Sequence, residues 1–162
     1  MNPRIVPDYR QLAARLAPER ERGSTLALAN GCFDVLHVGH VRLLAEARTH
    51  ADLLVVALNS DDSARSLKGE GRPLVPLEER MEVVAALAGV DFVTSFDELT
   101  ASALIEALRP EVQIKGTDRS PESVPERAQV ERYGGRIVIC GDPKTHSSTT
   151  LAERLRGSRP AR

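Results

Sequence analysis

The stretch that decides the fold reads Asn30-Gly31-Cys32-Phe33-Asp34-Val35-Leu36-His37-Val38-Gly39-His40. An apolar run at residues 25–29 precedes it and predicts a buried strand, while residues 41–47 after it have the spacing of an amphipathic helix. A strand, a glycine turn and a helix N-terminus form an anion site, because free N–H groups and the positive end of the helix dipole attract phosphate. The two histidines add donors that can follow charge between phosphate oxygens. The stretch therefore predicts chemistry on a nucleotide phosphate as well as its binding.

Outward from this stretch, apolar strand-like runs alternate with helical patterns. Strands are predicted at residues 25–29, 53–58, 91–95, 112–115 and 136–140. Helices are predicted at residues 7–16, 39–50, 77–87, 100–108, 126–133 and 149–156. The polar residues 59–76 predict a loop or a short helix. This alternation predicts an α/β fold: a single-domain, doubly wound, parallel five-stranded sheet of the Rossmann-like type.

Composition excludes several classes of protein. The chain has 162 residues, enough for one domain with a core, and its 22 basic and 23 acidic residues leave a net charge of −1. Such a balance argues against a general nucleic-acid or membrane-surface binder. No apolar run approaches membrane-spanning length, and residues 1–10 lack the apolar core of a signal peptide, so the cytoplasm is the expected location. Cys32 and Cys140 are too few for a disulfide framework, and we expect both to be reduced.

Unusual polar residues follow the ends of the predicted strands. In a doubly wound sheet, ligands bind beyond the carboxyl ends of the strands, where these segments would meet. The chain has only three lysines, Lys68, Lys115 and Lys144, each in a loop with Gly or Pro. Compact ammonium groups suit phosphate, although an arginine-rich chain could also retain three lysines by chance. The positions at strand ends favour a phosphate site.

Three features have competing interpretations. Cys32, His37 and His40 could form a zinc site, but their spacing matches no standard finger and no fourth ligand is evident. Arg80 begins a predicted helix, where arginine is usually solvated or ion-paired. Residues 147–150 open the last helix, where hydroxyls can cap the helix or bind phosphate. The P-loop and dinucleotide fingerprints are absent from the sequence.

Four motifs together point to one family. They are Gly31-Cys32-Phe33-Asp34 with His37-Val38-Gly39-His40, Pro76-Leu77-Glu78-Glu79-Arg80, Lys115-Gly116-Thr117-Asp118 and Ser148-Thr149-Thr150. The set resembles the cytidylyltransferase-like nucleotidyltransferase superfamily, and within it the stand-alone D-glycero-β-D-manno-heptose 1-phosphate adenylyltransferases. Asn59-Ser60-Asp61 and Leu67-Lys68-Gly69 with Arg72-Pro73 are typical of that subgroup. We accordingly expect a helical extension at residues 1–23, a nucleotidyltransferase domain at 24–156 and a flexible tail at 157–162.

The resemblance implies a role for each matching residue. His37, His40 and Lys68 are expected to be catalytic, the histidines on the nucleotide phosphates and Lys68 in a flexible loop that closes over them. The residues expected to bind nucleotide are Gly31, Cys32, Phe33, Gly39, His40, Arg80, Lys115, Gly116, Asp118, Ser148, Thr149 and Thr150. The residues expected to bind the second substrate are Asp34, Asn59, Lys68 and Lys144.

The implied reaction joins ATP and heptose 1-phosphate to give ADP-heptose and pyrophosphate. A sugar phosphate has its second pKa at about 6, so the nucleophile is already anionic and needs no general base. Mg²⁺ is the expected cofactor. We expect the substrate phosphates to supply most of its ligands, and we expect no site made by protein residues alone. The expected partners are small molecules, without nucleic acid or membrane, and a homodimer is one assembly that the resemblance allows. A glycerol-3-phosphate or related alcohol-phosphate cytidylyltransferase, and a non-catalytic nucleotide sensor, stay open as alternatives.

Overall fold

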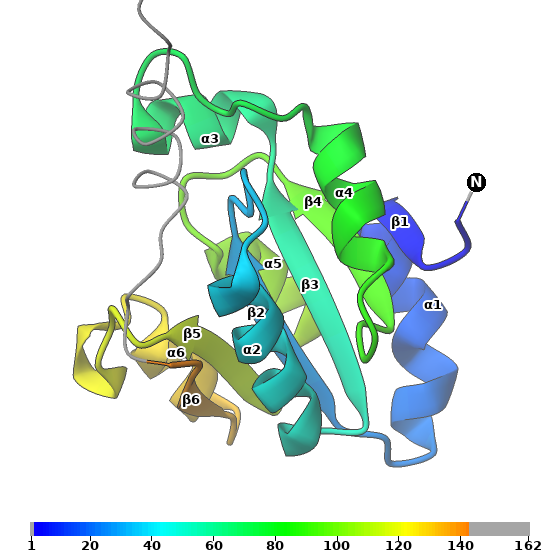
Figure 1. Cartoon of the computed structure of the whole chain (residues 1–162). Coiled ribbons are helices and arrows are strands. Elements are labelled where there is room, and N and C mark those ends of the chain that lie inside the picture. Colours follow the sequence, from blue (N-terminus) through cyan, green and yellow to red (C-terminus); the bar gives the residue numbers. More distant parts are fainter. Residues whose placement is uncertain (1, 143–162) are drawn as a thin grey trace, which may run out of the picture.

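The structure, a computed structural model, describes residues 2–142 (Figure 1). Its centre is one sheet of six strands in the order β1-β4-β3-β2-β5-β6, all parallel to their neighbours. The strands are β1 (Ile5–Asp8), β2 (Leu26–Gly31), β3 (Leu53–Asn59), β4 (Phe92–Phe96), β5 (Val112–Gly116) and β6 (Arg136–Cys140). The doubly wound parallel α/β fold is confirmed. The helix expected at 149–156 and the tail at 157–162 lie outside the described residues.

In this part of the chain, six α-helices and two short 3-10 helices connect the strands. They are α1 (Tyr9–Glu21), α2 (Val38–Ala47), η1 (Arg48–His50), α3 (Asp61–Lys68), α4 (Leu77–Ala85), α5 (Ser102–Leu108), η2 (Pro121–Ser123) and α6 (Arg127–Arg132). The polar stretch at 59–76, expected as a loop or short helix, contains α3. The helix expected at 7–16 starts two residues later and runs past Pro18 to Glu21.

The prediction of five strands was wrong by one. The sixth strand, β1, pairs with β4 at the edge of the sheet, inside the segment expected to be only helical. Ile5 and Val6 are its only aliphatic residues, and Pro7 follows them. A proline is tolerated in an edge strand, where its missing N–H costs no ladder bond on the open side. So short and interrupted a pattern does not predict a strand by itself.

Two hydrophobic cores cover the two faces of the sheet. On one face, Ala27 and Ala29 of β2 belong to a buried cluster with residues of α2 and α4. On the other face, Leu26 and Leu28 belong to a cluster with residues of α1, α5 and α6. Alternate residues of β2 thus point to opposite faces, and its first four residues are all buried because helices cover both sides.

The strand order reverses beside β2. From β2 the chain moves through β3 to β4 on one side, and later returns to place β5 on the other side of β2. The crevice beyond the carboxyl ends of strands at such a reversal is where doubly wound sheets bind ligands. Here it lies between the stretch after β2 and the loop after β5. Within residues 2–142, no helix combines the length and apolar character that a membrane crossing requires.

Candidate active site

A cavity of about 670 Å³ lies at the carboxyl ends of the strands, where the fold predicts a ligand site. Segments after β2, β3, β4, β5 and β6 contribute to its walls. The predicted site residues that line it are Gly31, Cys32, Phe33, Asp34, His37, Gly39, His40, Asn59, Lys68, Lys115, Gly116 and Asp118. Arg80 is not among the lining residues. Lys144, Ser148, Thr149 and Thr150 lie outside the described residues.

His37 caps the N-terminus of α2 and faces the cavity. Its Nδ1 accepts a hydrogen bond from the Gly39 N–H at 3.1 Å. An Nδ1 that accepts this bond carries no proton, so Nε2 is the ring nitrogen that can donate to a ligand. The ring stacks on His40 with 3.9 Å between ring centroids and 30° between planes. The sequence therefore folds the histidine pair into one stacked unit at the positive end of a helix.

His40, the second member of this pair, also lies against the ring of Phe33. Its ring centroid is 5.1 Å from that of Phe33, a buried residue whose φ of 47° is unusual for a side chain with a Cβ. Burial, and next the neighbouring His37 ring, lower the pKa of His40 to about 4. The ring is therefore neutral at pH 7. Its Nδ1 is buried without a hydrogen-bond partner among residues 2–142, as expected of a group that completes its bonding with a ligand or water.

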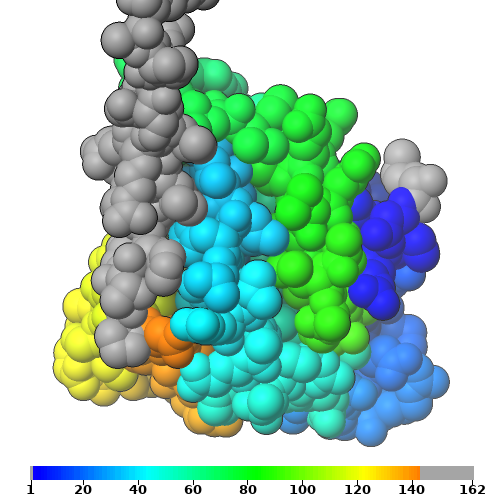
Figure 2. Space-filling view, viewed as in Figure 1, coloured from blue at the N-terminus to red at the C-terminus, as the bar shows by residue number. Residues whose placement is uncertain are grey.

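Asp34 lines the cavity but holds the protein's own backbone and side chains. Its Oδ2 accepts from the Arg72 guanidinium at 2.6 Å, and its Oδ1 accepts from the N–H groups of Leu74 and Val75 at 2.7 and 3.1 Å. The carboxylate thereby fixes the loop before α4 against the stretch after β2, and Figure 2 shows these two segments, light blue and green, side by side. Binding of the second substrate by Asp34 stays a prediction.

Arg80 corrects one expectation. It is only 1% exposed, and its guanidinium donates to the carbonyl oxygens of Val75, Cys32 and Asn59 at 2.9, 2.6 and 2.9 Å. It also donates to Asp61 Oδ1 at 2.6 Å. The expectation that Arg80 reaches a nucleotide phosphate is not met in this structure, because the side chain is committed to joining three loops beneath the cavity.

Lys115 occupies the opposite wall. Its Nζ donates to Asn30 Oδ1 at 2.9 Å and lies 3.4 Å from Glu126 Oε2. Burial lowers the pKa of the Lys115 ammonium, and the charge of Glu126 opposes that shift. Asn30 Oδ1 also accepts from Gln113 at 2.8 Å, so one amide oxygen orients two side chains of β5. Lysine, asparagine and glutamate together present a polar wall in a mostly buried setting.

The remaining predicted residues occupy the rim and the base. Lys68 ends α3 and is followed by Gly69, whose φ of 92° turns the chain away from the helix. Cys32 Sγ lies 3.7 Å from Asn59 Oδ1, and burial raises the pKa of this thiol, so it is packed and protonated. A Cβ on Gly116 would lie 3.0 Å from Asp118 Oδ1, so a larger residue would require this carboxylate to shift.

Sequence reasoning did not single out Asn30, Arg72 and Glu126 as site residues. Arg72 was quoted as part of a subgroup motif and Asn30 as the first residue of the decisive stretch, but neither residue was given a role. Arg72 is a site residue because it lines the cavity, forms a 2.6 Å salt bridge with Asp34 and has a side chain only 13% exposed. Glu126 follows an irregular loop, and no local pattern in the sequence indicates that it returns to Lys115.

The chain is similar to known proteins in both sequence and fold. The family described as "Cytidylyltransferase-like" matches residues 28–154. "Bifunctional protein HldE" of Geotalea uraniireducens (strain Rf4) is 51% identical over 145 residues, which are 90% of this chain and 30% of that protein. The protein of the same name from Syntrophotalea carbinolica is 49% identical over 140 residues, 86% of this chain and 29% of that protein. The chain thus spans about 30% of the length of these relatives.

Two solved structures share the fold. A lipopolysaccharide core biosynthesis protein from Thermoplasma volcanium superposes with a TM-score of 0.66 at 24% identity, covering 75% of this chain and 100% of that one. A pantothenate synthetase from Thermus thermophilus superposes with a TM-score of 0.60 at 16% identity, covering 84% of this chain and 60% of that one. At these identities the similarity establishes the fold alone.

The structural role of Arg80 makes the first prediction. We expect Arg80→Lys to lower the free energy of unfolding by about 3 kcal/mol, because lysine keeps the charge but cannot donate to several buried oxygens at once. Urea unfolding measures the change. Arg65→Lys is the matched control, since Arg65 is half-exposed and pairs with Asp62, and it should change stability by less than about 0.5 kcal/mol. If Arg80→Lys were as stable as the wild type but bound ATP poorly, the structural role would be wrong and Arg80 would be a ligand-binding residue.

The neutral His40 makes the second prediction. Its pKa is about 4 in the folded chain, against an ordinary 6.5, so the unfolded chain binds more protons between these values. The contribution of His40 to stability is therefore complete above pH 6.5 and is lost as the pH falls through about 4. Urea unfolding of the wild type and of His40→Gln from about pH 7 to about pH 4 should show a smaller loss in the variant. Equal losses in the two proteins would contradict the assigned pKa.

Proposed function

Because the chain belongs to the cytidylyltransferase-like family, we propose that it transfers the adenylyl group of ATP to D-glycero-β-D-manno-heptose 1-phosphate. The products are ADP-heptose and pyrophosphate. The observation that carries this proposal is the stacked pair of His37 and His40 at the start of α2, on a cavity at the reversal of strand order. Such a pair supplies donors to phosphate in the place where the fold binds its ligand.

The reaction needs alignment and charge stabilisation more than proton transfer. A phosphate oxygen of the sugar phosphate bonds to the α-phosphorus of ATP, and the bond from that phosphorus to the bridging oxygen of the β-phosphate breaks. The nucleophile is already anionic at neutral pH and the departing pyrophosphate carries away the electron pair, so no proton has to be removed. Binding both reactants in one cavity makes the attack effectively intramolecular.

The described residues can stabilise the charge that moves during this step. His37 accepts the Gly39 N–H through Nδ1, so its proton is on Nε2, from which it donates to a phosphate oxygen. The N–H groups at the start of α2 favour the same anion. Lys68 at the end of α3 and Lys115 on the far wall place ammonium groups on two sides of the cavity. These donors are preorganised by the fold, which is the main source of catalysis in phosphoryl and nucleotidyl transfer.

Mg²⁺ fits this site as an ion carried by the phosphates. The carboxylates on the cavity wall are Asp34, Asp118, Glu126 and Asp142. Asp34 is bonded through both oxygens, Asp142 pairs with Arg42, and the charges of Glu126 and Asp118 both act on the ammonium of Lys115. Phosphate oxygens are therefore the ligands that we propose for Mg²⁺, which often binds through substrate phosphates with few carboxylates. When bound, the ion offsets negative charge on the phosphates.

The choice of heptose 1-phosphate rests on the relatives. The motifs quoted above resemble those of heptose 1-phosphate adenylyltransferases, and the relatives at 51% and 49% identity are named as bifunctional proteins. This chain matches about 30% of their length, a portion suited to one activity of two. We propose that the chain carries the adenylyltransferase activity.

A substrate matrix tests the proposal. ATP and CTP are each combined with heptose 1-phosphate, glycerol 3-phosphate and other polyol phosphates, and pyrophosphate release is measured. We expect release with ATP and the heptose phosphate at a kcat/KM at least about 100-fold above every other pair, because a site that bonds to substrate hydroxyls rejects analogues lacking them. Preference for CTP and glycerol 3-phosphate would instead make the chain an alcohol-phosphate cytidylyltransferase. Tight ATP binding without release would make it a nucleotide sensor.

The histidine pair makes a further prediction. His40→Ala should lower kcat by roughly 10²–10³, the usual effect of losing one preorganised donor to a developing charge. Val41→Ala is the matched control, because Val41 is the next residue of α2, is exposed and does not line the cavity. Steady-state pyrophosphate release measures both, and unfolding curves confirm that both fold. Turnover close to wild type in His40→Ala would remove this residue from the mechanism.

A further inference from the structure

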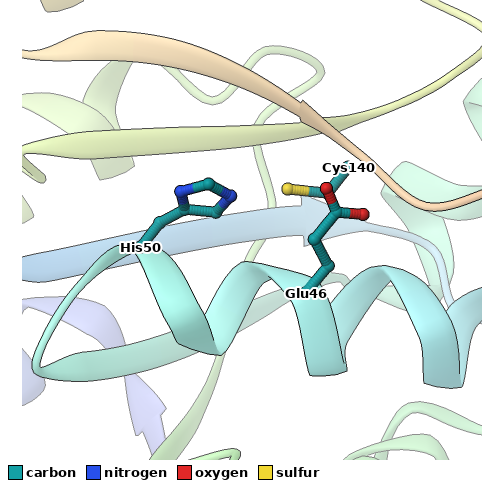
Figure 3. Close-up of side chains that lie close together, drawn as sticks. All are labelled: Glu46, His50 and Cys140. Carbon is teal, nitrogen blue, oxygen red and sulfur yellow. The ribbon is translucent and has the colours of Figure 1, made fainter.

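We propose that Glu46, His50 and Cys140 form a zinc-binding site that joins the end of α2 to the end of β6 (Figure 3). One ligand atom from each of these residues lies within 4.8 Å of the others. Among residues 2–142, this is the one group of three or more potential metal ligands that meets that limit. The alternative set considered from the sequence, Cys32, His37 and His40, does not meet it.

The geometry follows from the helix and the sheet. Glu46 and His50 are four residues apart on α2 and its continuation η1, and this spacing places two side chains on one helical face. Cys140 is the last residue of β6 and is 1% exposed. Figure 3 shows its sulfur between the imidazole ring of His50 and the carboxylate of Glu46. Two separate elements thus supply ligands to one point.

The ligands are already oriented, and two of them lack other partners. Glu46 Oε2 accepts the N–H of Gly141 at 2.7 Å, which fixes the carboxylate beside Cys140 and leaves Oε1 for an ion. Such an outer bond to a ligating carboxylate is typical of metal sites. Within residues 2–142, neither the His50 ring nor the Cys140 thiol makes a side-chain hydrogen bond. The imidazole and the thiol are therefore available as metal ligands, because no side-chain hydrogen bond in the described residues uses them.

The ligand types select the metal. Sulfur, nitrogen and oxygen donors together suit zinc, which binds tetrahedrally to Cys, His and carboxylate. Magnesium and calcium prefer oxygen donors alone, so this site differs from the one that carries the phosphates. Three protein ligands leave the fourth position to water. On binding, a bond forms between Zn²⁺ and sulfur, the thiol proton goes to solvent, and no electron is transferred.

A bound ion would lie at the edge of the cavity. Cys140 lines the cavity, whereas Glu46 and His50 do not, and Glu46 follows His40 by six residues, about 9 Å along the helix. The ion would fix the far end of the helix whose first turn carries His37 and His40. The role we infer is structural, and it holds whichever substrate the cavity accepts.

The test uses the full chain, freed of metal by a chelator and kept reduced with a phosphine. Cobalt(II) reports on sulfur coordination through a thiolate-to-cobalt charge-transfer band in the near ultraviolet, and a competing chromophoric chelator measures zinc affinity. We expect the band in the wild type and an upward shift in melting temperature with zinc. Cys140→Ser should abolish the band, and His50→Ala should weaken zinc binding by more than about 100-fold, beyond the effect typical of losing an outer-shell partner.

Cys32→Ser is the matched control, since it removes the other cysteine, and it should keep the band and the wild-type zinc affinity. Absence of the band in the wild type would overturn the proposal. So would a band that persists in Cys140→Ser and disappears in Cys32→Ser. His50→Ala changes a half-buried residue in a short 3-10 helix, so it tests the site even if Cys140→Ser folds poorly.

Discussion

One buried guanidinium holds together the segments that form the cavity. Arg80 donates to carbonyl oxygens after β2, at the end of β3 and before α4, and its charge is balanced by Asp61. These three backbone oxygens would otherwise be buried without a hydrogen bond, each at a cost of about 1–3 kcal/mol. A planar cation with five donors satisfies them together, which no lysine can do. The position of the histidine pair depends on this support, because the stretch that Arg80 holds at Cys32 continues directly into α2.

The charges of the cavity are arranged mainly as internal pairs. Arg72 pairs with Asp34, Arg42 with Asp142, and Lys115 lies beside Glu126. These pairs maintain the shape of the walls but leave little net positive charge, consistent with a chain of net charge −1. In the proposed reaction, a polyanionic ligand would therefore meet oriented N–H donors, the imidazoles of His37 and His40, and Lys68, which makes no salt bridge among the described residues. Directed donors favour a particular phosphate geometry, whereas a broad basic patch would bind many polyanions.

The sequence predicted the repetitive parts of this arrangement well. Continuous apolar runs bounded by glycine and polar residues marked the five strands from β2 to β6, and the rule for doubly wound sheets brought distant segments to one edge. β1 was missed because two aliphatic residues before a proline are too few to show a strand's alternating pattern. The strand is defined by its pairing with β4, which lies far away in the sequence. Arg80 and Asp34 were identified as important but assigned to ligands, since a pattern shows residue type and spacing but not which partner a side chain finds. Burial decides that, and burial is a property of the whole fold.

Neutral histidines change what the cavity can do as a ligand enters. The low pKa of His40 reflects burial and a neighbouring imidazole in the absence of negative charge. A triphosphate placed beside the stacked rings supplies that charge, and a nearby anion raises the pKa of imidazole. The pair therefore gains affinity for a proton as negative charge accumulates on the phosphates. Because the charge on the departing pyrophosphate is greatest late in the proposed reaction, the same rings would stabilise its later stages more than the bound substrate. Stronger interaction with the transition state than with the ground state is the condition for catalysis, and buried imidazoles that respond to phosphate charge would meet it.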